Sequence, residues 1–148
     1  MTARIAQSNP TALVGLGKVL VAVYGVLALA ASGRSFVQIA TNFAYAPLAY
    51  VFSATSAVVY LVATVALFKS KGLWRYVAWV AICFELIGVI AVGTLSVFDP
   101  ILFPSDTVWS YFGRGYLFVP LVLPILGIIW LAKSKHLAKV STGNGLGT

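Results

Sequence analysis

The sequence predicts an all-α membrane protein, a bundle of four transmembrane helices with short interfacial helices in its outer loops. Its 148 residues are 61% hydrophobic and only 9% charged, whereas soluble domains are about 45–50% apolar and about 25% charged. Four separate apolar runs each approach the ~20 residues that cross a hydrocarbon core of about 30 Å. Apart from Lys18, the basic residues stand singly near the ends of these runs, which is where membrane topology places them.

We expect one membrane domain over residues 1–140, followed by a Gly-rich tail over residues 141–148 that is predicted to be disordered. Helices are the expected conformation because a backbone in lipid has to pair its polar groups internally. The strands of a transmembrane barrel would alternate polar and apolar residues, and these runs do not alternate. The four predicted spans cover about residues 11–32, 47–68, 74–95 and 115–132.

The basic residues also predict the orientation of the spans. They precede the first span, join the second to the third and follow the fourth: Arg4, Lys69, Lys71, Arg75, Lys133, Lys135 and Lys139. With four spans these three segments lie on one side, and the side richer in Lys and Arg is cytoplasmic. We therefore expect a multi-pass protein of the cell membrane, with both termini cytoplasmic and the two longer loops outside.

The first apolar run has an alternative interpretation. Arg4 followed by an apolar stretch that ends in residues 28–30 (ALA) is similar to a signal peptide with a small-residue cleavage site. Cleavage there would leave three spans and an external N-terminus. The length of the run and the presence of Lys18 favour a retained span.

Glu85 is the most unusual residue of the third run, because it lies about eleven residues into the span, near the bilayer centre. A carboxylate at that depth costs several kcal/mol unless it is paired, hydrogen-bonded or protonated. Its helical neighbours are mostly small residues, which let helices approach closely: Ala78, Ala81, Gly88 and Val92. We therefore expect Glu85 to face another helix rather than lipid.

Lys18 is the second charged residue inside an apolar run, and it also lies on a stripe of small residues. At about 1.5 Å per residue, Lys18 lies roughly 10 Å and Glu85 roughly 16 Å from the same membrane surface. We predict a Lys18–Glu85 ion pair between the first and third spans, serving either as a structural contact or as a proton-coupled site. Alternatively, Lys18 extends to the headgroups while Glu85 is protonated or accepts a hydroxyl hydrogen bond. The candidate donors are Ser53, Ser56, Tyr60 and Thr64.

The loop between the third and fourth runs predicts one or two short helices on the outer membrane surface. Asp99 before Pro100 is a typical helix start, and Asp106 with Thr107 offers a second one. Trp109 belongs to an aromatic segment that follows. This segment is interpreted either as a docking platform or lid for a hydrophobic ligand, or as an ordered connection.

Two arginines accompany the aspartates of the outer loops. Arg34 and Arg114 could pair with Asp99 and Asp106 and so join the two loops. They could equally bind lipid phosphates.

Several function classes are disfavoured by composition. The net charge of +7 would suit nucleic acid, but the basic residues are scattered rather than gathered on one face. One cysteine, Cys83, and one histidine, His136, are too few for a zinc or bis-His haem site. No nucleophile–base set or Gly-rich phosphate loop is visible. We expect no catalysis, no cofactor, no metal site and no nucleic-acid partner.

Two resemblances accompany these patterns. The size and four-helix plan are similar to those of the small multidrug-resistance transporters, whose membrane glutamate lies in the first span rather than the third. Residues 33–35 (GRS), 46–50 (APLAY), 107–110 (TVWS) and 112–113 (FG) resemble uncharacterised four-span membrane proteins of actinobacteria. This second resemblance covers most of the chain and implies no activity.

The leading functional prediction is a non-catalytic membrane subunit or assembly factor of a larger envelope or respiratory complex. The alternative is a small proton-coupled transporter, or a lipid- or hydrophobe-binding protein, in which Glu85 titrates. The expected partners are the lipid bilayer together with another membrane protein or further copies of this chain. Small-residue helix faces and the absence of a visible catalytic set favour the first prediction.

Overall fold

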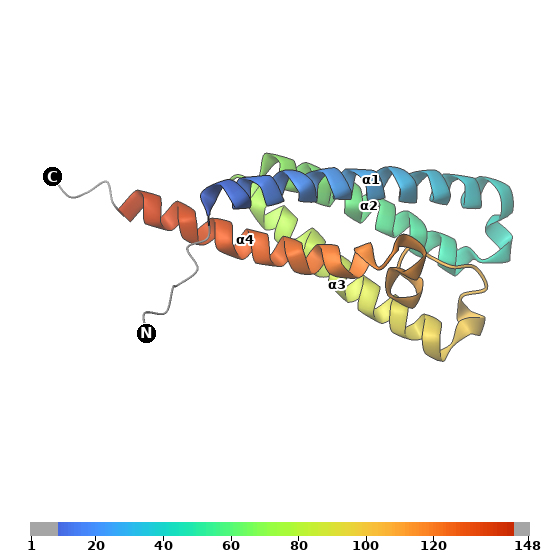
Figure 1. Cartoon of the computed structure of the whole chain (residues 1–148). Coiled ribbons are helices and arrows are strands. Elements are labelled where there is room, and N and C mark those ends of the chain that lie inside the picture. Colours follow the sequence, from blue (N-terminus) through green and yellow to red (C-terminus); the bar gives the residue numbers. More distant parts are fainter. Residues whose placement is uncertain (1–8, 144–148) are drawn as a thin grey trace.

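The structure is a computed structural model that describes residues 9–143, with side chains described for residues 9–135. Within this part of the chain every regular element is a helix, so the all-α prediction is confirmed. Figure 1 shows the four long helices with the short ones between them. In chain order the elements are α1 (Pro10–Asn42), η1 (Phe43–Tyr45), α2 (Pro47–Lys69), α3 (Leu73–Phe98), η2 (Pro100–Leu102), η3 (Ser110–Tyr116) and α4 (Val119–Gly143).

Three of the long helices can cross a membrane by length and composition: α1 together with η1, then α2, then α3. A fourth span is counted only if η3 and α4, which meet at 98°, are taken together. Three or four long apolar helices are typical of a multi-pass membrane protein. Proline begins both α1 and α2, where its missing N–H removes no helical hydrogen bond.

The helix contacts run in a ring, from α1 to α2, α3, α4 and back to α1. In Figure 1, α1 and α2 lie side by side, and theirs is the most extensive of these contacts. Both helices carry small residues at buried positions, a composition that lets two backbones approach: Ala28, Ala31, Ala49, Ala57, Ala63 and Ala66. The ion pair predicted from the sequence would join the first and third spans, whereas in the ring α1 and α3 lie diagonally opposite each other.

The buried stripe of α1 is not the one that contains Lys18. Inward-facing positions recur every three or four residues: Leu13, Gly17, Leu20, Tyr24, Leu27, Ala28, Ala31 and Ser35. Lys18 is exposed, as are Gly15 and Ala22 of the small-residue stripe that the sequence suggested as a packing face. The buried face of α1 therefore combines Leu and Tyr with small side chains, and it excludes Lys18.

Side-chain contacts to α4 tie the helices together at the end where α3 begins. The guanidinium of Arg75 donates hydrogen bonds to the Leu131 carbonyl and, at 3.0 Å, to the Ser134 hydroxyl. The Trp130 indole N–H donates to the Leu13 carbonyl at 2.8 Å. These contacts fix α4 against α3 and against α1.

The outer loop folds inward instead of lying flat on a surface. Residues 107–110 are buried, and the exposed fraction of Trp109 is 1%. Its ring lies so close to Gly88 of α3 that a Cβ on that glycine would approach the ring to 2.6 Å. Gly88 lies ten residues before Phe98, the last residue of α3, which is a depth of about 15 Å. Trp109, which the sequence placed in a segment on the outer membrane surface, is therefore packed inside the protein, because Gly88 leaves a space that the indole fills.

A left-handed turn completes the inward loop. Tyr111, Phe112 and Gly113 have φ of 49°, 61° and 80°, and two non-glycine residues in this region cost roughly 1–2 kcal/mol each. Phe112 packs against Gly93 of α3, where an added Cβ would lie 2.7 Å from the phenyl ring. Burial of aromatic surface against α3 compensates for the backbone strain.

The helices differ in length, which determines the level of Lys18. α1 has 33 residues and α2 has 23, so α1 extends beyond the end of α2 by roughly 15 Å. Lys18 lines a groove with Ser70, the residue that caps α2, and is therefore level with that end. α4 runs to Gly143 and so includes the first residues of the predicted tail, while residues 144–148 and Arg4 lie outside the described residues.

Candidate functional site

Four polar side chains from four segments meet inside the protein, and we refer to Tyr24, Tyr60, Glu85 and Trp109 as the polar cluster. Each has at most 1% of its surface exposed. The Tyr24 hydroxyl of α1 donates to Oε2 of Glu85 on α3 at 2.6 Å. The Trp109 indole donates to the Tyr60 hydroxyl of α2 at 2.8 Å. The two tyrosine rings lie 6.2 Å apart between centroids, so the two hydrogen-bonded pairs are neighbours.

Helical spacing directs each member of the polar cluster inward. Tyr24 follows Leu20 by four residues on the buried stripe of α1. Glu85 lies between Ile82 and Val89 on the buried stripe of α3. Because side chains three or four residues apart share one helix face, a carboxylate on this apolar stripe has to face the interior.

A reciprocal pair of hydrogen bonds holds the loop that supplies Trp109. The Thr107 hydroxyl accepts from the backbone N–H of Ser110 at 3.0 Å, and the Ser110 hydroxyl accepts from the N–H of Thr107 at 2.8 Å. Thr107 also accepts from the N–H of Trp109 at 3.1 Å. The reciprocal pattern is like that of a capping box, although η3 begins only at Ser110 and its N-cap, Trp109, makes no side-chain capping bond. The bonds satisfy backbone groups that burial removes from water.

The two carboxylate oxygens of Glu85 have different environments. Oε2 accepts the Tyr24 hydrogen bond, whereas Oε1 is buried without a hydrogen-bond partner among the described atoms. A buried polar atom without a partner costs roughly 1–3 kcal/mol. Oε1 is therefore the atom at which this cluster can hold a proton or accept a further donor.

The structure does not bring Lys18 to Glu85. Lys18 is exposed on α1, and Glu85 is bonded to Tyr24 instead. Tyr24 lies six residues after Lys18, which at 100° per residue places the two about 120° apart around the helix. The residue that reaches Glu85 is thus on a different face of α1 from the lysine.

The serines predicted as hydroxyl donors to Glu85 are also bonded elsewhere or unpaired. The Ser56 hydroxyl donates to the Ser53 carbonyl at 2.7 Å, as serine in a helix often does. The Ser53 hydroxyl is buried without a partner among the described atoms. Tyr60 does join the cluster, as the acceptor of the Trp109 hydrogen bond. Thr64 donates to the Tyr60 carbonyl at 2.7 Å.

Tyr24 was missed by the reasoning from sequence, although a signal for it exists. It is the single polar side chain between Lys18 and Ser32. A tyrosine in the middle of an apolar helix usually has a partner for its hydroxyl. A mid-span tyrosine and a mid-span glutamate would therefore have been a better pair than two opposite charges.

The outer-loop residues are connected in part. The Arg34 guanidinium donates to the backbone carbonyl of Asp106 at 2.6 Å, so the loops are joined through a carbonyl rather than a carboxylate. Arg114 lies 4.5 Å from the centroid of the Tyr111 ring, a cation–π distance. Asp99 is exposed and precedes η2 without a side-chain capping bond.

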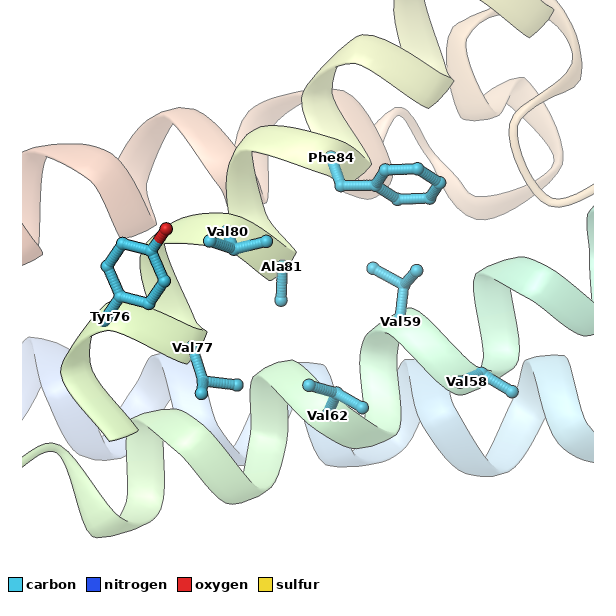
Figure 2. A pocket seen from close by; sticks show the side chains of 8 residues that line it. All are labelled: Val58, Val59, Val62, Tyr76, Val77, Val80, Ala81 and Phe84. Atoms are coloured by element: carbon cyan, nitrogen blue, oxygen red, sulfur yellow. The ribbon is translucent and has the colours of Figure 1, made fainter. Parts of the chain in front are cut away.

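An open groove lies between α2 and α3, beside the polar cluster, and we call it the valine groove. Its volume is about 300 Å³, and Figure 2 shows the apolar side chains of both helices along it. Val59 and Phe84 contribute to its wall, although the residues that follow them in the chain belong to the polar cluster. The other lining residues are Val58, Val62, Tyr76, Val77, Val80 and Ala81.

Neither a metal site nor a known relative helps to define the function. Among the described residues no three His, Cys, Asp or Glu side chains are grouped to hold a metal ion. The chain matches no protein-family model, no curated protein and no solved structure. The function therefore has to be inferred from the polar cluster and the grooves themselves.

Proposed function

We propose that this protein is a four-span helical bundle of the cell membrane that acts as a non-catalytic subunit or assembly factor of a larger membrane complex. In this proposal both termini are cytoplasmic and the inward-folded loop is on the outer side. The excess of Lys and Arg at one end supports this orientation. The bend between η3 and α4 then marks where the chain enters its fourth span.

The proposal rests on one contrast: the side chains of the polar cluster have partners within the chain, whereas an apolar groove at the surface is unfilled. Inside, Tyr24, Tyr60, Glu85 and Trp109 are occupied by contacts between segments of the same chain. Outside, the valine groove leaves about 300 Å³ of apolar space unfilled between two helices. A transmembrane helix of another protein is the proposed occupant, because van der Waals packing drives membrane helices together and β-branched side chains have little rotamer freedom to lose when a helix packs on them.

The proposed orientation is tested with single cysteines. Asp106→Cys is expected to react with a membrane-impermeant maleimide in intact cells, whereas Lys71→Cys is expected to react only after the cells are opened. Both positions are exposed in the structure. The native Cys83 is half-buried in α3 and is replaced by serine as the common background. Labelling of Lys71→Cys in intact cells would contradict the proposed orientation.

The proposed role is tested by purification from native membranes in a mild detergent. Wild-type protein is expected to retain an unrelated membrane protein in a fixed ratio. Val62→Trp would fill the valine groove and is expected to release that partner. The matched control is Val26→Trp, because Val26 is an exposed valine on α1 outside the groove. Equal partner retention by all three proteins would contradict the proposal.

A second candidate function is favoured by the unpaired oxygen of Glu85. A buried carboxylate with a free acceptor is suited to proton-coupled transport or to binding a small hydrophobic molecule with one donor. In that case the purified protein would be self-associated without another subunit. Glu85→Gln would abolish ligand binding or proton coupling in proteoliposomes while leaving the assembly intact. Unchanged coupling in Glu85→Gln would exclude this candidate.

A further inference from the structure

A second open groove lies at the end of the molecule where α2 finishes, and we call it the Lys18 groove. It is bounded by α1, by the last turn and cap of α2 and by the middle of α4, and its volume is about 490 Å³. Most of its walls are apolar, whereas Lys18 and Ser70 are polar. The lining residues include Gly17, Lys18, Val21, Phe68, Ser70 and Trp130.

The groove is shaped by a close contact between α1 and α4. Trp130 packs its ring against Gly17, where an added Cβ would lie 2.7 Å from the ring. Its indole N–H is already used by the Leu13 carbonyl. The tryptophan therefore offers the groove an apolar surface and no free donor. Phe68 and Val21 complete a wall suited to a hydrocarbon chain.

The charge in the groove is positive and has no acidic neighbour. The chain has only three acidic residues. Glu85 is buried and bonded to Tyr24, while Asp99 and Asp106 lie in the outer loop at the far ends of α3 and α1. Lys69, the nearest lysine along α2, places its ammonium 4.2 Å over the Trp74 ring. Lys18 is thus the cation that the groove itself presents.

The position of Lys18 relative to the membrane surface determines which kind of anion can reach it. The lysine is level with Ser70 at the end of α2, where an apolar helix meets the headgroup layer. Basic pockets between helices at this level bind anionic lipid headgroups. We propose that the Lys18 groove binds one anionic phospholipid, with its phosphate at the Lys18 ammonium and an acyl chain along Val21, Phe68 and Trp130.

The test measures lipid binding to purified, delipidated protein by native mass spectrometry. The probes are phosphatidylglycerol and, as the uncharged comparison, phosphatidylcholine. Wild-type protein is expected to bind one phosphatidylglycerol more tightly than phosphatidylcholine. Lys18→Gln is expected to weaken phosphatidylglycerol binding about fivefold, as expected for one basic residue near a charged surface, and to leave phosphatidylcholine binding unchanged.

Two further variants distinguish a specific lipid-binding site from nonspecific electrostatic attraction of anionic lipid. Lys71→Gln removes the same charge from an exposed position outside the groove and is expected to change binding less than twofold. Val21→Trp fills the groove and is expected to weaken binding of both lipids. Circular dichroism checks that every variant is folded. Wild-type affinity in Lys18→Gln, or an equal loss in Lys71→Gln, would overturn the proposal.

The lipid tail also needs a test of its own. Glycerol 3-phosphate carries a similar anionic group without acyl chains and is expected not to displace phosphatidylglycerol. Displacement by equal concentrations of glycerol 3-phosphate would show a phosphate site rather than a lipid site, and would contradict the inference.

Discussion

The polar cluster and the valine groove share two helices, α2 and α3, whose neighbouring side chains lie in opposite environments. Tyr60 and Glu85 are fully buried and hydrogen-bonded to other segments. Their immediate predecessors, Val59 and Phe84, line an open apolar groove. Consecutive residues on one helix thus face in different directions: one stabilises the interior, and the one before it lines the surface groove. Substitutions in the polar cluster should change folding, whereas substitutions in the valine groove should change association.

Replacement of Trp109 should have the largest effect on this contrast. Trp109→Ala removes the indole that fills the space above Gly88 and donates to Tyr60. We expect the free energy of unfolding to fall by about 3–5 kcal/mol, as for other large buried aromatic residues. Reversible unfolding in mixtures of mild detergent and dodecyl sulfate measures the change. Trp74→Ala is the control, because Trp74 is 36% exposed, and it should cost much less.

Loss of the Tyr24 hydroxyl should have the next largest effect. Tyr24→Phe leaves both carboxylate oxygens of Glu85 without a described partner, and the expected cost is about 1–3 kcal/mol. Tyr76→Phe removes a hydroxyl from a side chain that is 69% exposed and should be nearly neutral. Equal unfolding free energies for the two variants would show that the Tyr24–Glu85 contact does not stabilise the fold.

Alanine substitutions of two glycines should change the stability by smaller amounts and in opposite directions. Gly15→Ala should stabilise by up to about 1 kcal/mol through helix propensity, since an added Cβ there meets nothing within 4 Å. Gly88→Ala should destabilise, because its Cβ would contact the Trp109 ring at 2.6 Å. Thermal unfolding of both variants in one detergent measures the difference. Stabilisation by Gly88→Ala would mean that Trp109 is not packed on α3.

The smallest effect on folding is expected in the valine groove. Val62→Ala shortens a side chain that is 37% exposed, and the free energy of unfolding should change by less than about 0.5 kcal/mol. Its effect should appear as a weaker hold on the membrane partner during purification. A large loss of stability without loss of the partner would mean that the valine groove stabilises the fold and does not bind the partner.

The sequence allowed the helices and some local contacts to be predicted. Long apolar runs between basic residues indicate transmembrane helices, and the structure is helical throughout residues 9–143 except for short connections. Asp106 with Thr107 was predicted as a helix start, but η3 begins at Ser110 with Trp109 as its N-cap and no side-chain capping bond. The Thr107 hydroxyl does accept the Ser110 N–H. An apolar helix depends on residues that are close together in the chain, and the sequence shows these residues directly.

Contacts between distant segments could not be predicted in the same way. Lys18 was paired with Glu85 by sign of charge and depth, but the turn of α1 places Tyr24 inward and Lys18 outward. Trp109 was expected at the surface because aromatic residues favour interfaces. Its burial depends on the space above Gly88, which is apparent only when α3 and the loop are seen together.

Site-specific photo-crosslinking in living cells shows directly whether the valine groove contacts another membrane protein. A benzophenone amino acid replaces Val62 in the valine groove, or Val26 on the exposed face of α1 as the control. We expect one discrete protein adduct from position 62, none from position 26, and loss of the position-62 adduct when Val58→Trp blocks the groove. Crosslinking to lipid alone at position 62, or the same protein adduct from both positions, would contradict the assignment of this groove as the contact with a membrane partner.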